Sequence, residues 1–195
     1  MTEVRILALD PGHKLGYCVD DAESPDKIRT GVCELPRHGP DRGKTWCYLE
    51  SWLLEMITQF RVTVLATEAP VPFGGRKGST MATSADAINF PIGLAAVVEL
   101  VGTRAGCICW AAPIATVRRH FTGSGKAGPE AKGRVYQRCR LLGLPVESLD
   151  AADATAIHDF CAHIYRRADL IPGPLFVAPG RSRSMRRPAP DLEVD

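Results

Sequence analysis

The chain has 195 residues, 45% of them hydrophobic, and a formal net charge of +2 at pH 7. This length and composition can bury a real core, so we expect one domain plus a tail, and the near-neutral charge excludes no class of partner. Seven cysteines without a CxxC pair fit poorly with a disulfide framework, and no apolar stretch approaches the length of a membrane span. We therefore expect a reduced, cytoplasmic protein.

Taken in chain order, the apolar pattern predicts an α/β protein with a mixed sheet of about five strands and helices on both faces. The first three predicted strands are antiparallel and cover residues 4–9, 15–19 and 29–35. Asp41 is expected to cap a helix that runs to about Phe60 and leads to a fourth strand, which ends at Glu68 and can lie parallel to the first. The remaining predicted elements are a helix over about 82–101 that Pro91 kinks or restarts, a strand at 107–110, and helices beginning at Pro113, at about Pro129 and at Leu149.

Four carboxylates stand where these elements could bring them together. Asp10 and Glu68 each end a predicted strand, and Asp150 and Asp153, three residues apart, share one face of the last helix. Each also has a simpler interpretation, such as a tight turn with Gly12 at positive φ after Asp10, or compensation of the helix dipole by the pair. Four converging acids would repel one another unless divalent cations neutralised them, so their joint occurrence predicts a Mg²⁺ site.

Basic residues are concentrated between Arg104 and Arg140, where eight of them stand against a single acid, Glu130. A solvated helix face is the usual role of such charge, but beside a metal site the segment favours a polyanionic partner. The candidate nucleic-acid contacts are Arg118, Arg119, Lys126 and Arg134, with Phe73, Arg76 and Lys77 in the Gly- and Pro-rich loop after Glu68. Phe73 could stack on bases opened at a branch point.

Three segments carry a family resemblance: Leu7-Ala-Leu-Asp-Pro-Gly-His-Lys-Leu-Gly-Tyr17, Leu65-Ala-Thr-Glu-Ala-Pro70 and Leu149-Asp-Ala-Ala-Asp-Ala-Thr-Ala-Ile157. They resemble the three acidic motifs of the RuvC family of Holliday junction resolvases, over about Val4 to Arg167. The resemblance implies an RNase H-like fold and a homodimer, and we expect a phage or prophage member of the family. We expect residues 1–170 to form the nuclease domain, and the Arg- and Pro-rich residues 171–195 to form a disordered tail that the family does not share. Pro91 falls within the helix that this family uses for dimer contact.

The resemblance also implies a chemistry, the metal-dependent cutting of four-way or branched DNA by paired phosphodiester hydrolysis. Asp10 would bridge two Mg²⁺ ions, for which Mn²⁺ is expected to substitute, and Glu68 and Asp153 would each hold one ion. Asp150 would hold an ion or position the attacking water. Lys132 is the preferred candidate to contact the scissile phosphate, with Lys126 as the second choice.

Three other functions remain open. Nucleases that process pre-16S rRNA share the Asp-x-Gly hairpin, although they are typically shorter and lack the strand ending of the Glu68 type. A DNA-structure binder that does not cleave would not require four intact acids. An actin-like ATPase is disfavoured because the chain is short and has no second phosphate-binding hairpin.

Overall fold

The computed structural model describes residues 3–24, 27–37, 39, 41–69, 85–128 and 130–167. These residues form a five-stranded sheet in the order β3-β2-β1-β4-β5. The strands are β1 (Ile6–Asp10), β2 (Lys14–Asp20), β3 (Ile28–Glu34), β4 (Val64–Glu68) and β5 (Ile108–Ala112). The first three are antiparallel, β4 is parallel to β1 and β5 is parallel to β4, which confirms the predicted mixed sheet.

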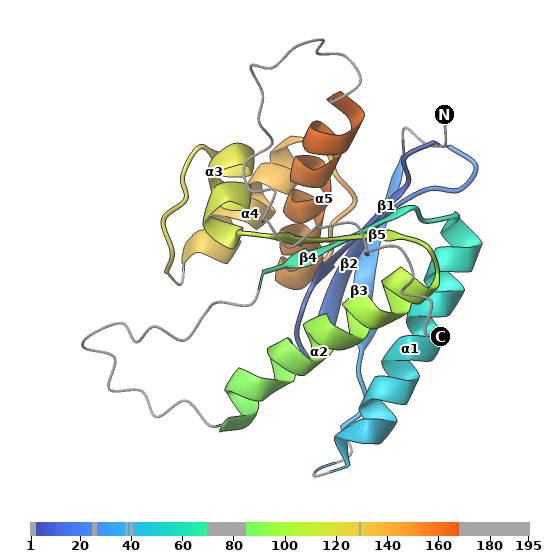
Figure 1. The fold of residues 1–195 in the computed structure, drawn as a ribbon. Coiled ribbons are helices and arrows are strands. Elements are labelled where there is room, and N and C mark those ends of the chain that lie inside the picture. The colour runs from blue at the N-terminus through green and yellow to red at the C-terminus, as the bar shows by residue number, and fades with distance from the viewer. Residues whose placement is uncertain are drawn as a thin grey trace, which may run out of the picture.

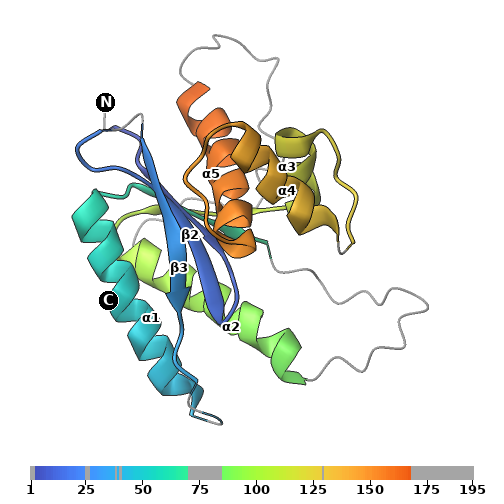
Figure 2. The ribbon, with the colours of Figure 1, turned by 180° about the vertical axis from the view of Figure 1, so that it is seen from behind.

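Five described helices cover the two faces of the sheet. They are α1 (Arg42–Phe60), α2 (Ala85–Arg104), α3 (Ile114–Thr122), α4 (Glu130–Leu141) and α5 (Leu149–Arg167). Figures 1 and 2 show α1 and α2 on one face and α3, α4 and α5 on the other. Strands β1 and β4 are parallel, and parallel strands need a long crossover because a tight turn reverses the direction of the chain. Helix α1 provides that crossover.

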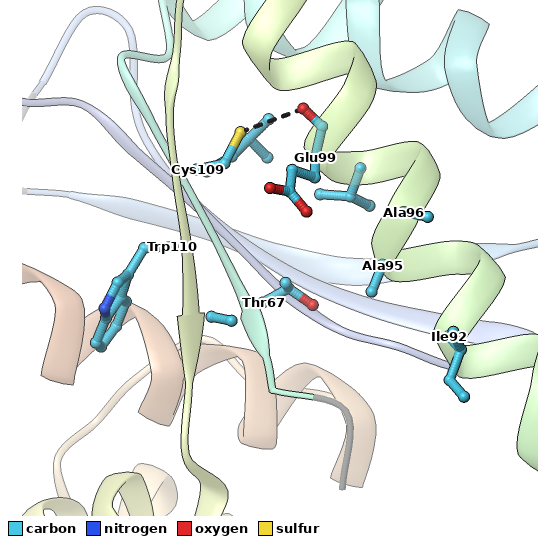
Figure 3. Close-up of a pocket in the computed structure, with 10 residues that line it drawn as sticks. Thr67, Ile92, Ala95, Ala96, Glu99, Cys109 and Trp110 are labelled. Carbon is cyan, nitrogen blue, oxygen red and sulfur yellow. Dashed lines mark hydrogen bonds between the residues drawn. The ribbon is translucent and has the colours of Figure 1, made fainter. Parts of the chain in front are cut away.

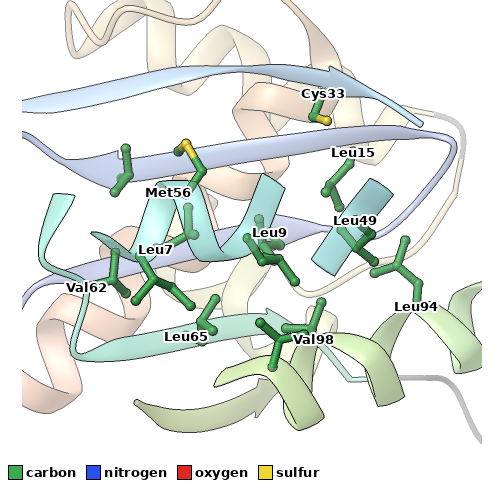
Figure 4. Packing of buried hydrophobic residues seen from close by; sticks show 14 of the residues in the cluster. Leu7, Leu9, Leu15, Cys33, Leu49, Met56, Val62, Leu65, Leu94 and Val98 are labelled. Carbon is green, nitrogen blue, oxygen red and sulfur yellow. The ribbon is translucent and has the colours of Figure 1, made fainter. Parts of the chain in front are cut away.

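The alternation of side chains along β1 divides the core into two layers. Leu7 and Leu9 pack with α1 and α2, as Figure 4 shows, whereas Ile6 and Ala8 pack with the helices on the opposite face. All of these side chains are fully buried. Because strand side chains alternate with a period of two, Asp10 must lie on the same face as Ile6 and Ala8. That is the face covered by α5.

Two local predictions are corrected by the structure. Asp41 does stand at the N-cap of α1, but its side chain makes no capping hydrogen bond and instead pairs with the Lys44 ammonium 3.2 Å away. Gly12 is not among the described glycines with positive φ, so the turn after Asp10 does not depend on a left-handed glycine there. Pro91 lies inside α2, which continues through it and does not restart.

All seven cysteines are free thiols, as the absence of paired spacing predicts. No helix in the described ranges is long and apolar enough to cross a membrane. The loop that carries Phe73, Arg76 and Lys77, and the segment 171–195, lie outside the described residues.

Candidate active site

Asp10 and Glu68 end two neighbouring parallel strands. The register pairs Ile6 with Val64 and Leu9 with Thr67, so one further step along both strands brings the two acids side by side. Ala66 packs in the same layer as Ile6, and alternation along β4 therefore directs Glu68 to the α5 face as well. Asp10 is buried and Glu68 half-buried, so both carboxylates lie at the sheet edge beneath the helices.

Helix α5 reaches this edge because β2 carries a glycine opposite Asp10. Gly16 is the register partner of Asp10, and a Cβ atom added to Gly16 would overlap the backbone carbonyl of Asp150. The small side chains that follow, including Ala151 and Ala152, are buried and let the first turn of the helix lie flat on the sheet. Gly16 thus makes room for α5 at the site, a role that was not predicted from the sequence. Its place opposite Asp10 in the predicted hairpin could have indicated this role.

The Lys132 ammonium of α4 joins three of the acids. Its Nζ lies 2.9 Å from Oδ2 of Asp10, 2.8 Å from Oδ1 of Asp150 and 3.3 Å from Oδ2 of Asp153. Asp153 is almost fully buried, with 1% of its side chain exposed, whereas Lys132 keeps 39% exposed. A charge-assisted hydrogen bond of this length is strong in a partly desolvated site, so Lys132 holds the three carboxylates together. Its predicted contact with the scissile phosphate stays a prediction.

A second cation, Arg118 of α3, lies against the same cluster. Its guanidinium is 3.4 Å from Oδ2 of Asp153, and only 14% of the side chain is exposed. Its buried Nε and the buried Oδ1 of Asp153 have no hydrogen-bond partner among the described residues. Sequence analysis grouped Arg118 with surface phosphate contacts, but the structure places it within the acidic cluster.

The other described candidates for DNA contact lie farther out. Arg119 and Lys126 are exposed. Arg134 pairs with the Glu130 carboxylate at 3.5 Å across one helix turn, and it also donates a hydrogen bond to the backbone carbonyl of Lys126 at 3.3 Å. Arg119, Lys126 and Arg134 therefore form an outer basic group that lies beside the buried acidic cluster and does not belong to it.

Burial shifts the ionisation of the site. Burial raises the pKa of Asp10 to about 6, although the Lys132 ammonium opposes the rise. Burial also raises the pKa of Glu68 to about 7, with the Asp10 carboxylate adding to the effect. Burial of Lys132 disfavours its charge, but the surrounding carboxylates outweigh this cost and raise its pKa. Near neutral pH, Asp10 is therefore mostly ionised, whereas Glu68 is protonated about half of the time.

The chemistry of the four acids suits a hard divalent cation. All four acids offer oxygen, which Mg²⁺ prefers, and Oδ1 of Asp153 is a buried acceptor without a donor. However, no three His, Cys, Asp or Glu side chains in the described part of the chain are arranged so that they could hold one metal ion. Oxygens of Asp10, Asp150 and Asp153 instead converge on the Lys132 ammonium, with distances of 2.9, 2.8 and 3.3 Å.

Structure comparison identifies the fold. A Thermus thermophilus RuvC structure aligns over 83% of this chain and 96% of its own length, with 23% sequence identity and a TM-score of 0.57. The chain has the RuvC fold. T. thermophilus RuvC in complex with a Holliday junction substrate aligns over the same shares with 21% identity and a TM-score of 0.56.

A more distant match, the yeast mitochondrial Holliday junction resolvase Ydc2, covers 79% of this chain and 75% of its own at 14% identity, with a TM-score of 0.48, and supports no argument. No protein-family model and no curated protein sequence matches the chain. At these identities the likeness to RuvC establishes the fold, and the activity must be argued from the site.

Proposed function

We propose that this chain is a metal-dependent, structure-selective endodeoxyribonuclease that resolves Holliday junctions or other branched DNA, with its nuclease domain in residues 1–170. The observation that carries the proposal is the convergence of Asp10, Glu68, Asp150 and Asp153 with Lys132 at one sheet edge. Four acids on a surface that only bound DNA would repel its phosphates. Their presence beside a basic segment favours hydrolysis over simple binding.

The four carboxylates would hold two Mg²⁺ ions, with Mn²⁺ able to substitute. When bound, the ions supply the acidification of an attacking water and the stabilisation of negative charge on the leaving 3′ oxygen. Burial raises the pKa of Asp10 to about 6 and that of Glu68 to about 7, so near neutral pH Glu68 still carries a proton part of the time, and a bound cation would displace it. The reaction adds one water across the phosphodiester bond, breaking the bond between phosphorus and the 3′ oxygen.

The two cations of the cluster have separate roles in this proposal. Lys132, once released from the carboxylates, reaches the scissile phosphate as a point charge on a flexible stem. Arg118 remains against Asp153, because its side chain is buried and cannot extend to solvent without leaving its pocket. Arg119, Lys126 and Arg134 grip the DNA backbone on the outer side, and Phe73, Arg76 and Lys77, outside the described residues, stay a prediction for the branch point.

A homodimer is the second part of the proposal, since paired cuts in a four-way junction require two sites related by a two-fold axis. An apolar pocket opens between α2 and strands β4 and β5, with Ile92, Ala95 and Ala96 on its helical side, as Figure 3 shows. Two large apolar side chains of α2 remain exposed: Ile92, which lines the pocket, is 48% accessible, and Leu100, farther along the helix, is 50% accessible. An exposed apolar surface of this kind supports association through α2.

The test is a cleavage assay in Mg²⁺ with a four-way junction, a fork, a nicked duplex and an RNA–DNA hybrid. We expect paired nicks in the branched DNA. Asp10→Asn and Glu68→Gln should abolish cleavage but leave junction binding within about threefold, because a neutral amide removes ligand charge and little contact area. The control is Glu55→Gln, an equivalent change at an exposed position of α1.

Three outcomes would contradict the proposal. Full cleavage by either amide variant would remove the acids from the mechanism. Cleavage of RNA substrates alone would favour a nuclease of the rRNA-processing type. Tight junction binding without any cleavage by the wild-type protein would favour a DNA-structure binder.

A further inference from the structure

An aromatic stack connects the turn after Asp10 to helix α2. His13 lies in the turn between β1 and β2, and its ring centroid is 3.9 Å from that of Phe90, with the ring planes only 22° apart. Trp46 of α1 is close to the same ring, with centroids 5.1 Å apart and planes at 31°. Phe90 of α2 therefore contacts both the turn, through His13, and helix α1, through Trp46.

The stack is built into the core. Phe90 is 7% exposed and belongs to the hydrophobic cluster formed with α1 and strands β1 and β2. One turn along α2, a Cβ atom added to Gly93 would come within 3.0 Å of the Trp46 ring, so the two helices approach closely there. Close packing of this kind fixes α2 against α1 and leaves little freedom for Phe90 to follow a moving turn.

The turn itself is anchored on its other side by a backbone hydrogen bond. The amide of Leu35, just beyond β3, donates to the carbonyl oxygen of His13 at 2.9 Å. Only Pro11, Gly12 and His13 separate Asp10 from β2, so a displacement of His13 is passed directly to Asp10. A displacement of about 1 Å at a reacting group can reduce the rate about a hundredfold.

We infer that His13 and Phe90 are positioning residues whose stacking holds the turn of residues 11–13, and with it Asp10, in register with Glu68 and Lys132. The contact also makes the geometry of the site depend on the placement of α2, which is the helix proposed for subunit contact. This inference rests on the proposed function, because it takes Asp10 as part of the nuclease centre.

The first experiment compares Phe90→Leu with Val101→Ala. Leucine at position 90 keeps an apolar side chain in the core but removes the ring face. Val101 also lies on α2 in the same cluster, is 2% exposed and does not line the pocket, so Val101→Ala removes packing at another place on the helix. We expect Phe90→Leu to lower kcat for junction cleavage about tenfold or more, with junction affinity unchanged within about threefold. Val101→Ala should lower the melting temperature with little effect on kcat.

Hydrogen exchange at the Leu35 amide gives a readout that does not depend on activity. Its proton is protected by the bond to His13, so opening of the turn exposes it. Under conditions in which local opening dominates, we expect exchange there to accelerate about tenfold in Phe90→Leu and to stay unchanged in Val101→Ala. Equal exchange in the two variants would overturn the inference.

A double-mutant cycle with His13→Ala tests whether the two residues act through each other. We expect each single variant to lose kcat and the double variant to lose no more than the worse single variant. Additive losses would mean that the two residues act independently, which would also overturn the inference. If the wild-type protein cuts no DNA at all, the proposed function fails, while the exchange measurement still decides whether Phe90 holds the turn.

Discussion

At the scale of single residues, the main observation is that one lysine holds three carboxylates together. Oxygens of Asp10, Asp150 and Asp153 all lie within 3.3 Å of the Lys132 Nζ. Carboxylates this close would repel one another strongly if Lys132 were neutral or absent. Lys132 therefore stabilises the cluster, and under the proposed function it would compete with Mg²⁺ for the same oxygens.

Lys132→Met should consequently tighten metal binding while impairing cleavage. The variant loses the competing ammonium, so we expect the affinity for Mg²⁺ to rise about tenfold, and the metal-free protein to melt at a lower temperature because the acids are left unpaired. Calorimetric titration with Mg²⁺ and melting curves with and without Mg²⁺ check both effects. Lys126→Met, at an exposed position, is the matched control. Weaker Mg²⁺ binding by Lys132→Met would show that the lysine does not compete with the metal.

The raised pKa values of Asp10 and Glu68 make metal binding depend on pH. Their values of about 6 and about 7 exceed those of the unfolded chain, so folding takes up protons. The stabilising contribution of these two groups is complete below about pH 4 and is lost as the pH rises through 6 and 7. Under the proposed function, Mg²⁺ would displace the same protons, so its affinity would rise with pH.

We expect the affinity for Mg²⁺ to be about ten- to a hundredfold weaker near pH 5.5 than near pH 7.5. Titration at the two pH values, with the ionic strength held constant, measures the difference. A neutral amide carries no titrating proton, so Glu68→Gln should show a smaller change. An affinity that is the same at both pH values would mean that Asp10 and Glu68 are already ionised in the metal-free protein.

The four acids could be predicted from the sequence because each depends on a local pattern. Asp10 and Glu68 follow apolar strands, and the spacing of Asp150 and Asp153 is helical. Lys132 was placed near the reacting centre by the family resemblance and not by a local pattern, and the position of Arg118 among the acids was not predicted. Their contacts with the acids depend on how α3 and α4 pack on α5, and no local periodicity in the sequence describes that packing.

At the scale of elements, the site depends on how closely α5 approaches β2. Helix α5 begins at Leu149 as predicted, and its residues Ala152, Ala156 and Phe160 are buried in the core. What the periodicity does not reveal is the distance between helix and sheet. That distance is set by Gly16, whose missing side chain leaves room for the Asp150 backbone.

Gly16→Ala should therefore displace α5 and impair both stability and cleavage. The added methyl meets backbone atoms, which cannot rotate away, so we expect a destabilisation of about 1–3 kcal/mol together with loss of junction cleavage. Gly12→Ala is the matched control, because its Cβ would lie 3.5 Å from the nearest atom, the backbone oxygen of Lys14, an ordinary contact. Melting temperature and cleavage rate, measured on both variants, decide the matter. A Gly16→Ala protein with wild-type activity would show that the helix can retreat without harm to the site.

At the scale of the whole molecule, the described surface is apolar on the side where α2 borders the edge strand β5. We expect the protein to be a homodimer at micromolar concentration and Ile92→Asp to shift it toward the monomer, since a charge cannot be buried unpaired in such an interface. Leu54→Asp, at an exposed position of α1, is the control with a similar change and similar exposure, 44% against 48%. Analytical ultracentrifugation gives the oligomeric state. A monomeric wild-type protein that still makes paired nicks would contradict the expectation.

The long separation in sequence between the parts of the site has a consequence for protein synthesis. Lys132 and Asp10 are 122 residues apart along the chain, and Asp150 lies 18 residues beyond Lys132. Contacts between such distant residues form late, after the intervening sheet and helices have closed. A chain cut short before Leu149 lacks Asp150 and Asp153. Under the proposed function, such a chain would be unable to cut DNA, and activity would appear only after α5 has been made and has packed on the sheet.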